Sequence, residues 1–207
     1  MTKSDREALD TPWAIQQFLS GIPYNPKEEC KSPGRVLLEG SAHCFEGALF
    51  AASRLRRIGH PPLLVDLRAW NDDDHVIAVF KEDGCWGAVA KSNFTTLQFR
   101  EPVYRSLREL AMSYFDLYFN TLGEKTLRAY SSVLRLAKFD DRDWMETDED
   151  LEYIGDDFSS LRYHDLVTPG RKALARLRRP HEGRSAPVGS GRAVQTVQRG
   201  RVKVGEV

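Results

Sequence analysis

The sequence predicts an α+β fold, because it contains two long helical stripes and one antiparallel hairpin. Apolar residues recur at helical spacing in residues 42–58 and 104–120, whereas residues 63–70, 75–80 and 85–90 are short strand-like runs. Asp83-Gly84, between the last two runs, is typical of a two-residue hairpin turn. With 207 residues, 41% of them hydrophobic, we expect one domain at 1–167 and a tail at 168–207.

The N-terminal part predicts one short helix followed by a connection. Residues 12–20 have apolar side chains at roughly helical spacing, with Thr11 as a possible cap and Pro12 at the first helical position. Residues 21–40 contain three prolines, so we expect them to form an ordered connection without a regular element.

The helix expected at 42–58 has the clearest pattern in the chain. Its apolar positions are 44, 48, 51, 55 and 58, and three arginines stand near its end. With Ser41 as N-cap, Cys44 would be the third helical residue and would face the packed side.

The hairpin leaves two registers open. A two-residue loop places Ser92 opposite His75, whereas a three-residue loop with Gly84 in the left-handed conformation moves Asn93 onto the face of His75. Beyond the hairpin we expect the helix at 104–120, a helix at 148–161 and a small helical lobe that closes the domain.

Charge divides the chain into an acidic body and a basic tail. Residues 168–207 hold ten Lys or Arg against two Asp or Glu, which leaves twenty against twenty-eight for residues 1–167. The tail has few bulky apolar residues, so we expect it to be disordered. Its basic cluster has no interleaved aromatic residues, so nucleic acid is not the expected partner, although charge alone leaves it open. The cluster consists of Arg171, Lys172, Arg176, Arg178 and Arg179.

The remaining composition favours a soluble cytoplasmic protein with reduced thiols. The first seven residues are mostly polar or charged, no apolar signal segment follows, and nowhere do eighteen apolar residues run together. Three scattered cysteines suggest neither a disulfide framework nor a four-ligand zinc site, so Cys30 and Cys85 are expected to be structural. We expect no membrane contact, no cofactor and no metal.

Cys44 and His75 are the candidate catalytic residues. A cysteine in the first turn of a helix faces the positive end of the macrodipole, which favours the thiolate, and a nearby histidine would supply the base. Asn93 is the preferred third member, since its carboxamide oxygen can fix the imidazole tautomer, and Ser92 is the alternative. The Cys44 N–H would stabilise an oxyanion, with Tyr24 or Asn25 as candidates for a second donor.

Three runs of the sequence carry a family resemblance. Ala42-His43-Cys44-Phe45-Glu46-Gly47-Ala48, the run 73–78 that contains His75, and the run 86–94 that begins at Trp86 resemble the transglutaminase-like branch of the papain-like superfamily, and in particular an uncharacterised bacterial group within it. The resemblance covers roughly residues 40–95. It implies that the cysteine helix packs on an antiparallel sheet, with Cys44 as nucleophile and His75 as base. Such domains usually have an aspartate shortly after the tryptophan, and Ala90 stands near that place in this chain.

Two function classes follow. The first is thiol-dependent acyl transfer or hydrolysis of a peptide, protein or other amide through a thioester, with Cys44, His75 and Asn93 as the site. The second is a catalytically silent transglutaminase-like module that binds a protein partner, which the absent aspartate favours. Structural alternatives are a buried core cysteine at 44, a surface histidine at 75, a divalent-ion site of His75 with Asp72, Asp73 and Asp74, and a zinc site of His43, Cys44 and His75.

Overall fold

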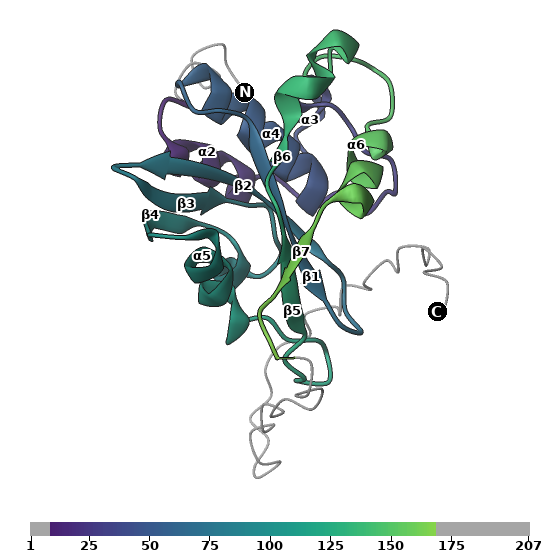
Figure 1. Ribbon diagram of the computed structural model, residues 1–207. Coiled ribbons are helices and arrows are strands. Elements are labelled where there is room, and N and C mark those ends of the chain that lie inside the picture. Colours follow the sequence, from purple (N-terminus) through teal and green to yellow (C-terminus); the bar gives the residue numbers. More distant parts are fainter. Residues whose placement is uncertain (1–8, 169–207) are drawn as a thin grey trace, which may run out of the picture.

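The computed structural model describes residues 9–168, which form a seven-stranded antiparallel sheet with helices on both faces (Figure 1). The strand order is β4-β3-β2-β1-β5-β7, and β6 pairs with β1. The α+β class predicted from the sequence is therefore confirmed. The strands are β1 (Leu63–Ala69), β2 (His75–Glu82), β3 (Cys85–Val89), β4 (Arg100–Tyr104), β5 (Leu127–Ser131), β6 (Leu134–Arg135) and β7 (Tyr163–Asp165).

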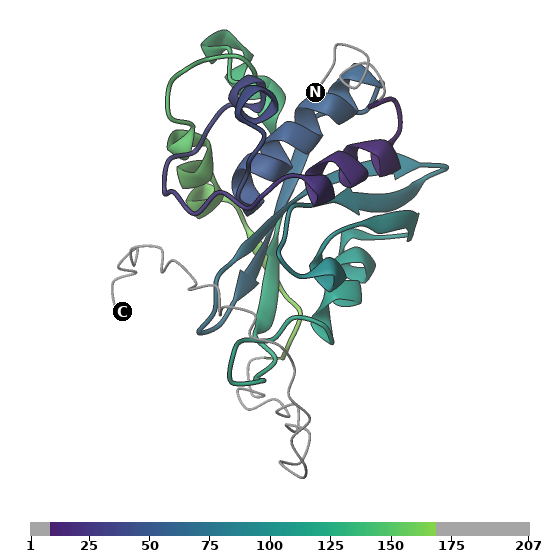
Figure 2. The same ribbon diagram turned by 180° about the vertical axis from the view of Figure 1, so that it is seen from behind.

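Helices cover the two faces of the sheet unequally. Helix α4 lies across one face with α2 beside it, and α5 lies on the other face (Figure 2). None of the described helices combines the length and the apolar character needed to cross a membrane. The α-helices are α2 (Pro12–Gly21), α3 (Pro33–Glu39), α4 (Cys44–Arg57), α5 (Leu107–Phe115) and α6 (Glu152–Asp156), and the 3-10 helices are η1 (Thr95–Leu97), η2 (Leu136–Arg142) and η3 (Asp157–Ser160).

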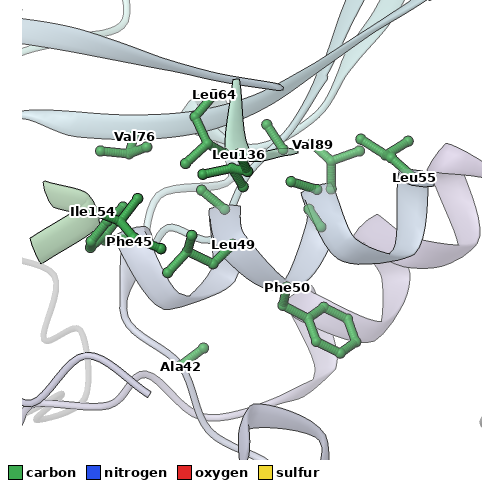
Figure 3. Packing of buried hydrophobic residues seen from close by; sticks show 14 of the residues in the cluster. Ala42, Phe45, Leu49, Phe50, Leu55, Leu64, Val76, Val89, Leu136 and Ile154 are labelled. Atoms are coloured by element: carbon green, nitrogen blue, oxygen red, sulfur yellow. The ribbon is translucent and has the colours of Figure 1, made fainter. Parts of the chain in front are cut away.

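Each face of the sheet has its own apolar core. On the first face, Phe45, Leu49 and Leu55 of α4 pack with Leu64 and Val76 of the sheet (Figure 3). The core on the second face lies between the sheet and α5, and its members include Leu67, Ile77, Ala88, Leu110, Tyr114 and Tyr118. The burial of both faces explains why β1 and β2 are nearly continuous apolar runs rather than alternating ones.

The alternation along β2 decides which core each of its side chains joins. Val76 belongs to the core under α4, whereas Ile77 belongs to the core under α5. His75 pairs with Leu67, a member of the α5 core, and so stands on the α5 face. Helix α4 does pack on the sheet that carries His75, but the His75 side chain stands on the face opposite to the body of the helix.

Several element bounds differ from the sequence-based prediction. Residues 33–39 form α3, where only a connection was expected, because Ser32 caps the helix, Pro33 begins it and Gly40 ends it at a φ of 67°. The expected helix at 104–120 is shorter, since β4 runs to Tyr104 and α5 spans only Leu107–Phe115. The helix expected at 148–161 is reduced to α6 and η3. The expected basic tail, with its cluster at 171–179, lies outside the described residues.

Candidate functional site

Cys44 is the first residue of α4, and its side chain is partly exposed. The N-cap is His43 rather than the predicted Ser41. The His43 N–H donates to Glu46 Oε2 at 2.8 Å, and the Glu46 N–H donates to His43 Nδ1 at 3.4 Å, which makes a capping box. Cys44 therefore lies closer to the positive end of the helix than the sequence predicted.

His43 has a structural role in this arrangement. Its Nδ1 accepts the Glu46 N–H, and its Nε2 lies 3.3 Å from the carbonyl oxygen of Glu29, to which it can donate. Both ring nitrogens thus bind protein groups, which disfavours the zinc site with Cys44. Within residues 9–168 no three His, Cys, Asp or Glu side chains gather in a group that could hold a metal ion.

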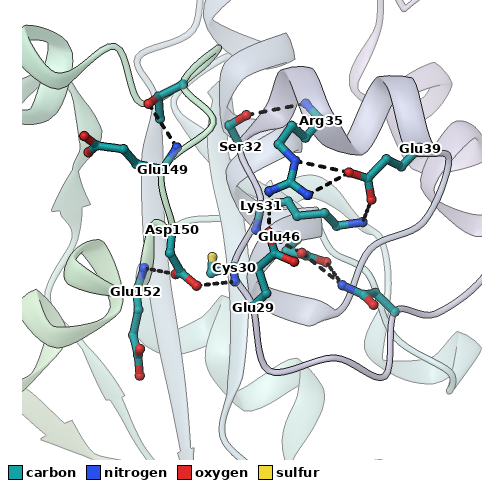
Figure 4. Close-up of polar contacts among 12 residues, drawn as sticks. Glu29, Cys30, Lys31, Ser32, Arg35, Glu39, Glu46, Glu149, Asp150 and Glu152 are labelled. Atoms are coloured by element: carbon teal, nitrogen blue, oxygen red, sulfur yellow. Dashed lines mark hydrogen bonds and ion pairs between the residues drawn. The ribbon is translucent and has the colours of Figure 1, made fainter.

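Glu46, in the first turn of α4, is a fully buried carboxylate with several hydrogen-bond partners (Figure 4). It accepts hydrogen bonds from the side-chain amide of Asn25 at 3.1 and 3.0 Å, and from the Lys31 N–H at 3.0 Å. Burial raises the pKa of Glu46, although these hydrogen bonds act in the opposite direction. Because Asn25 is committed to Glu46, it is poorly placed to serve as the second oxyanion donor.

Lys31 extends the same buried network to the segment before Cys44. Its ammonium group donates to Glu39 Oε2 at 3.0 Å and to both the carbonyl and the hydroxyl of Ser41 at 3.1 Å. The hydroxyl of Ser41, the predicted cap, is therefore used by Lys31 instead. The network fixes residues 25–31 and 41–43 against the first turn of α4.

His75 begins β2 and is 5% exposed. Its Nε2 lies 2.9 Å from the carbonyl oxygen of Leu97. A carbonyl can only accept, so Nε2 carries the proton and Nδ1 of the neutral ring has the lone pair. Burial lowers the pKa of His75 to about 4, helped by the charge of Arg100 and opposed by the hydrogen bond to Leu97. At neutral pH the ring is an uncharged base.

The hairpin adopts the register that favours Ser92 over Asn93. Asp83 and Gly84 form the loop with φ angles of 48° and 79°, and Glu82 pairs with Cys85. Continued pairing in this register would place Ser92 opposite His75, but β3 ends at Val89. The Ser92 hydroxyl accepts the Phe94 N–H at 3.1 Å, and Asn93 is exposed. The His75 ring thus hydrogen-bonds to the Leu97 carbonyl, the role that the sequence assigned to Asn93.

Tyr118 binds the loop that precedes His75. Its hydroxyl donates to the Asp73 carbonyl at 2.6 Å, two residues before His75. Burial raises the pKa of Tyr118, and the nearby carboxylates of Asp72 and Asp74 raise it further. The Tyr118 hydroxyl therefore lies beside the loop before β2.

The acidic loop before His75 has local structural partners. Asp72 Oδ2 accepts the Thr126 hydroxyl at 2.7 Å, and Asp74 Oδ1 accepts the Ala69 N–H at 2.7 Å. These bonds hold the loop between β1 and β2 in place. His75 itself turns its Nε2 to Leu97 rather than to these carboxylates, which disfavours the divalent-ion site.

Glu46 and Leu97 were not predicted from the sequence. The His43-x-x-Glu46 spacing is a capping-box signal, but it was missed because Ser41 is the commoner type of cap. A backbone acceptor such as the Leu97 carbonyl has no sequence signal. The chain matches no family model and no curated protein, so the transglutaminase-like assignment stays a prediction from the three motif runs.

Proposed function

We propose that this protein is a thiol-dependent acyltransferase or amide hydrolase with Cys44 as nucleophile and His75 as base. The observation that supports it most is the 2.9 Å hydrogen bond from His75 Nε2 to the Leu97 carbonyl. It holds the ring in one tautomer and leaves Nδ1 as the proton acceptor, which is the role that an asparagine or aspartate has in a Cys-His triad.

The proposed reaction needs only groups that the chain supplies. As the Cys44 Sγ–carbon bond forms, the thiol proton moves to His75 Nδ1 and the carbonyl electron pair moves to oxygen. N–H groups at the start of α4 face this developing charge. Collapse of the intermediate breaks the carbon–nitrogen bond, and the proton on Nδ1 goes to the leaving amine. Water then attacks the thioester with Nδ1 as its base, and sulfur regains its proton when the carbon–sulfur bond breaks.

The low pKa of His75 disfavours a resting thiolate–imidazolium pair. A ring with a pKa of about 4 is uncharged at neutral pH, so it takes the thiol proton only during the attack. Hydrolysis requires no pocket for a second substrate. We therefore favour a peptide or other amide substrate with water as the acceptor.

The test is acetylation by p-nitrophenyl acetate, an acyl donor that needs little recognition. We expect an acetyl thioester on Cys44, detected by mass spectrometry and cleaved by hydroxylamine, together with release of p-nitrophenol. His75→Ala should slow this by about 10²-fold or more, because a positioned base contributes about 10² to 10⁴. Cys85→Ala is the matched control, since Cys85 is also partly exposed and begins β3. Equal acetylation of Cys44 and Cys85 would refute the proposal.

The second candidate is a catalytically silent module that binds a protein partner. It is favoured by Ala90, which stands near the place where transglutaminase-like domains usually have an aspartate. Ala90 is fully buried, and its N–H and carbonyl both bond to the Gln16 side chain at 3.0 Å. Slow acetylation of Cys44 that is unaffected by His75→Ala would support this reading.

A further inference from the structure

The loop that presents the Leu97 carbonyl is held by hydrogen bonds on both sides of that residue. The Leu97 N–H donates to the Phe94 carbonyl at 3.0 Å, and the Gln98 N–H donates to the Thr95 carbonyl at 3.3 Å. The Gln98 side chain donates to the Ser92 carbonyl at 2.9 Å. The Tyr114 hydroxyl of α5 donates to the Gln98 carbonyl at 3.0 Å. An acceptor fixed in this way can orient a ring more sharply than a mobile loop could.

Arg100 is the side chain that binds this loop to α5. Nη1 donates to the Phe99 carbonyl and Nη2 to the Thr96 carbonyl, both at 2.8 Å, so the guanidinium bridges the residues on either side of Leu97 and Gln98. Nε donates to the Ser113 hydroxyl of α5 at 2.9 Å. The guanidinium also stacks over the Tyr114 ring, 3.8 Å from its centroid. A lysine could not reproduce these contacts, because an ammonium group is a point donor rather than a planar fork.

We propose that Arg100 is a positioning residue for the base of the proposed reaction, acting through the Leu97 carbonyl on His75. The contacts form a direct series. Arg100 binds the carbonyls of Thr96 and Phe99, and Leu97 lies in the loop between them. The Leu97 carbonyl oxygen accepts the hydrogen bond that His75 Nε2 donates. In a triad made of side chains, a single residue both accepts the hydrogen bond from the histidine and orients its ring. Here the backbone provides the acceptor, and Arg100 provides the rigidity. The inference builds on the proposed function, but it concerns the state of His75 and has its own readout.

The test is the tautomer of His75, measured by nitrogen-15 NMR of the full chain with labelled histidine. The chain has five histidines, and His75→Gln assigns the relevant signals. The wild type should show His75 protonated at Nε2 alone. Arg100→Lys keeps the positive charge but loses the guanidinium that binds two carbonyls at once. The tautomer of His75 that is protonated at Nδ1 should therefore appear. Acetylation of Cys44 should then slow by about tenfold, part of the factor of about 10² to 10⁴ that a positioned base supplies.

Arg108→Lys is the matched control. Arg108 also binds backbone carbonyls with its guanidinium, those of Asp165 at 2.9 Å and Leu166 at 3.4 Å, but it does so at β7 and beyond rather than at the Leu97 loop. A general loss of rigidity would affect both variants, whereas positioning through Leu97 predicts a tautomer change only in Arg100→Lys. Should Arg100→Lys fail to fold, Ser113→Ala removes one guanidinium contact while Arg100 stays, and it should give a smaller change of the same kind.

The two proposals fail in different ways. An unchanged His75 tautomer in a folded Arg100→Lys, with wild-type acetylation, overturns the role of Arg100 and leaves the proposed reaction standing. A wild type in which Cys44 is not acetylated faster than Cys85 overturns the reaction, while the tautomer measurement still decides whether Arg100 positions His75.

Discussion

Replacing His75 by glutamine should remove a loss of stability that the wild-type protein suffers as the pH falls below about 6.5. The ring is 5% exposed, and burial lowers its pKa from 6.5 to about 4. The unfolded chain takes up this proton near pH 6.5 and the folded protein only near pH 4. Acid in this window therefore favours the unfolded chain. Glutamine can still donate to the Leu97 carbonyl but does not titrate.

The size of the effect follows from the pKa difference. A shift of about 2.5 units corresponds to about 3 kcal/mol of unfolding free energy once the pH is below 4, and about 2 kcal/mol of this should be lost between pH 7 and pH 5. Urea unfolding at pH 7.0, 6.0 and 5.0 measures it. The free energy of unfolding of the wild type minus that of His75→Gln should decrease by about 2 kcal/mol across this range.

Other titrating groups cancel in this comparison. Burial raises the pKa of Glu46, so falling pH favours the folded state at that residue, but Glu46 is present in both proteins. His164→Gln is the control, because His164 is only half-buried on β7 and leaves His75 in place. Parallel stability curves for the wild type and His75→Gln would refute the reasoning, since they would mean that the buried ring is protonated as readily as in the unfolded chain.

Three further predictions concern packing and surface charge, and urea unfolding at neutral pH measures each of them. Gly47→Ala should cost about 1–3 kcal/mol, because its new Cβ would lie 2.2 Å from the Cβ of Lys91, whereas Gly21→Ala, with nothing within 4 Å, should change stability by less than about 1 kcal/mol. Equal losses would contradict the close approach of α4 to the segment after β3. Lys91→Met should cost about 1–3 kcal/mol, because the buried ammonium donates at 2.9 and 2.6 Å to two carbonyls at the end of α2, which would lose these bonds. A neutral result would mean that water replaces the ammonium. Arg56→Ala should cost no more than about 1 kcal/mol despite its paired contacts with Asp140, because both side chains are more than a third exposed. A larger loss would show that this ion pair fixes η2 to α4.

The local elements could be predicted from the sequence because their signals are local. The apolar stripe of α4 and the Asp83-Gly84 turn are each specified within a few residues, and the turn alone sets the pairing of β2 with β3. The second half of the sheet has no such signal. In the pairing of β1 with β5, Leu67 lies opposite Tyr130, and neither strand has a sequence signal that identifies the strand with which it pairs. The same holds for β7, which contains only three residues.

In the candidate site, too, single residues with local sequence signals could be predicted, whereas those set by tertiary contacts could not. Cys44 and His75 could be selected because thiols and imidazoles are few and stand at element ends. The cap was misassigned because the Ser41 hydroxyl binds the buried Lys31 ammonium, a contact between residues ten apart that no capping rule contains. The acceptor for His75 was missed because every residue has a carbonyl, and only the tertiary structure decides which one meets the ring.

A backbone carbonyl in place of a carboxylate has a consequence for how the proposed site would work. A carboxylate would stabilise the imidazolium and raise its pKa strongly. Here burial and the charge of Arg100 lower the pKa of His75, and the hydrogen bond to Leu97 opposes them only in part, so the ring stays neutral. A neutral ring accepts a proton during attack but does not stabilise a thiolate beforehand. His75→Gln should therefore slow acetylation of Cys44 without raising the apparent thiol pKa seen in the pH dependence of its alkylation by iodoacetamide. A rise of about one unit on losing His75 would reveal a thiolate–imidazolium pair and would refute the neutral-base reasoning.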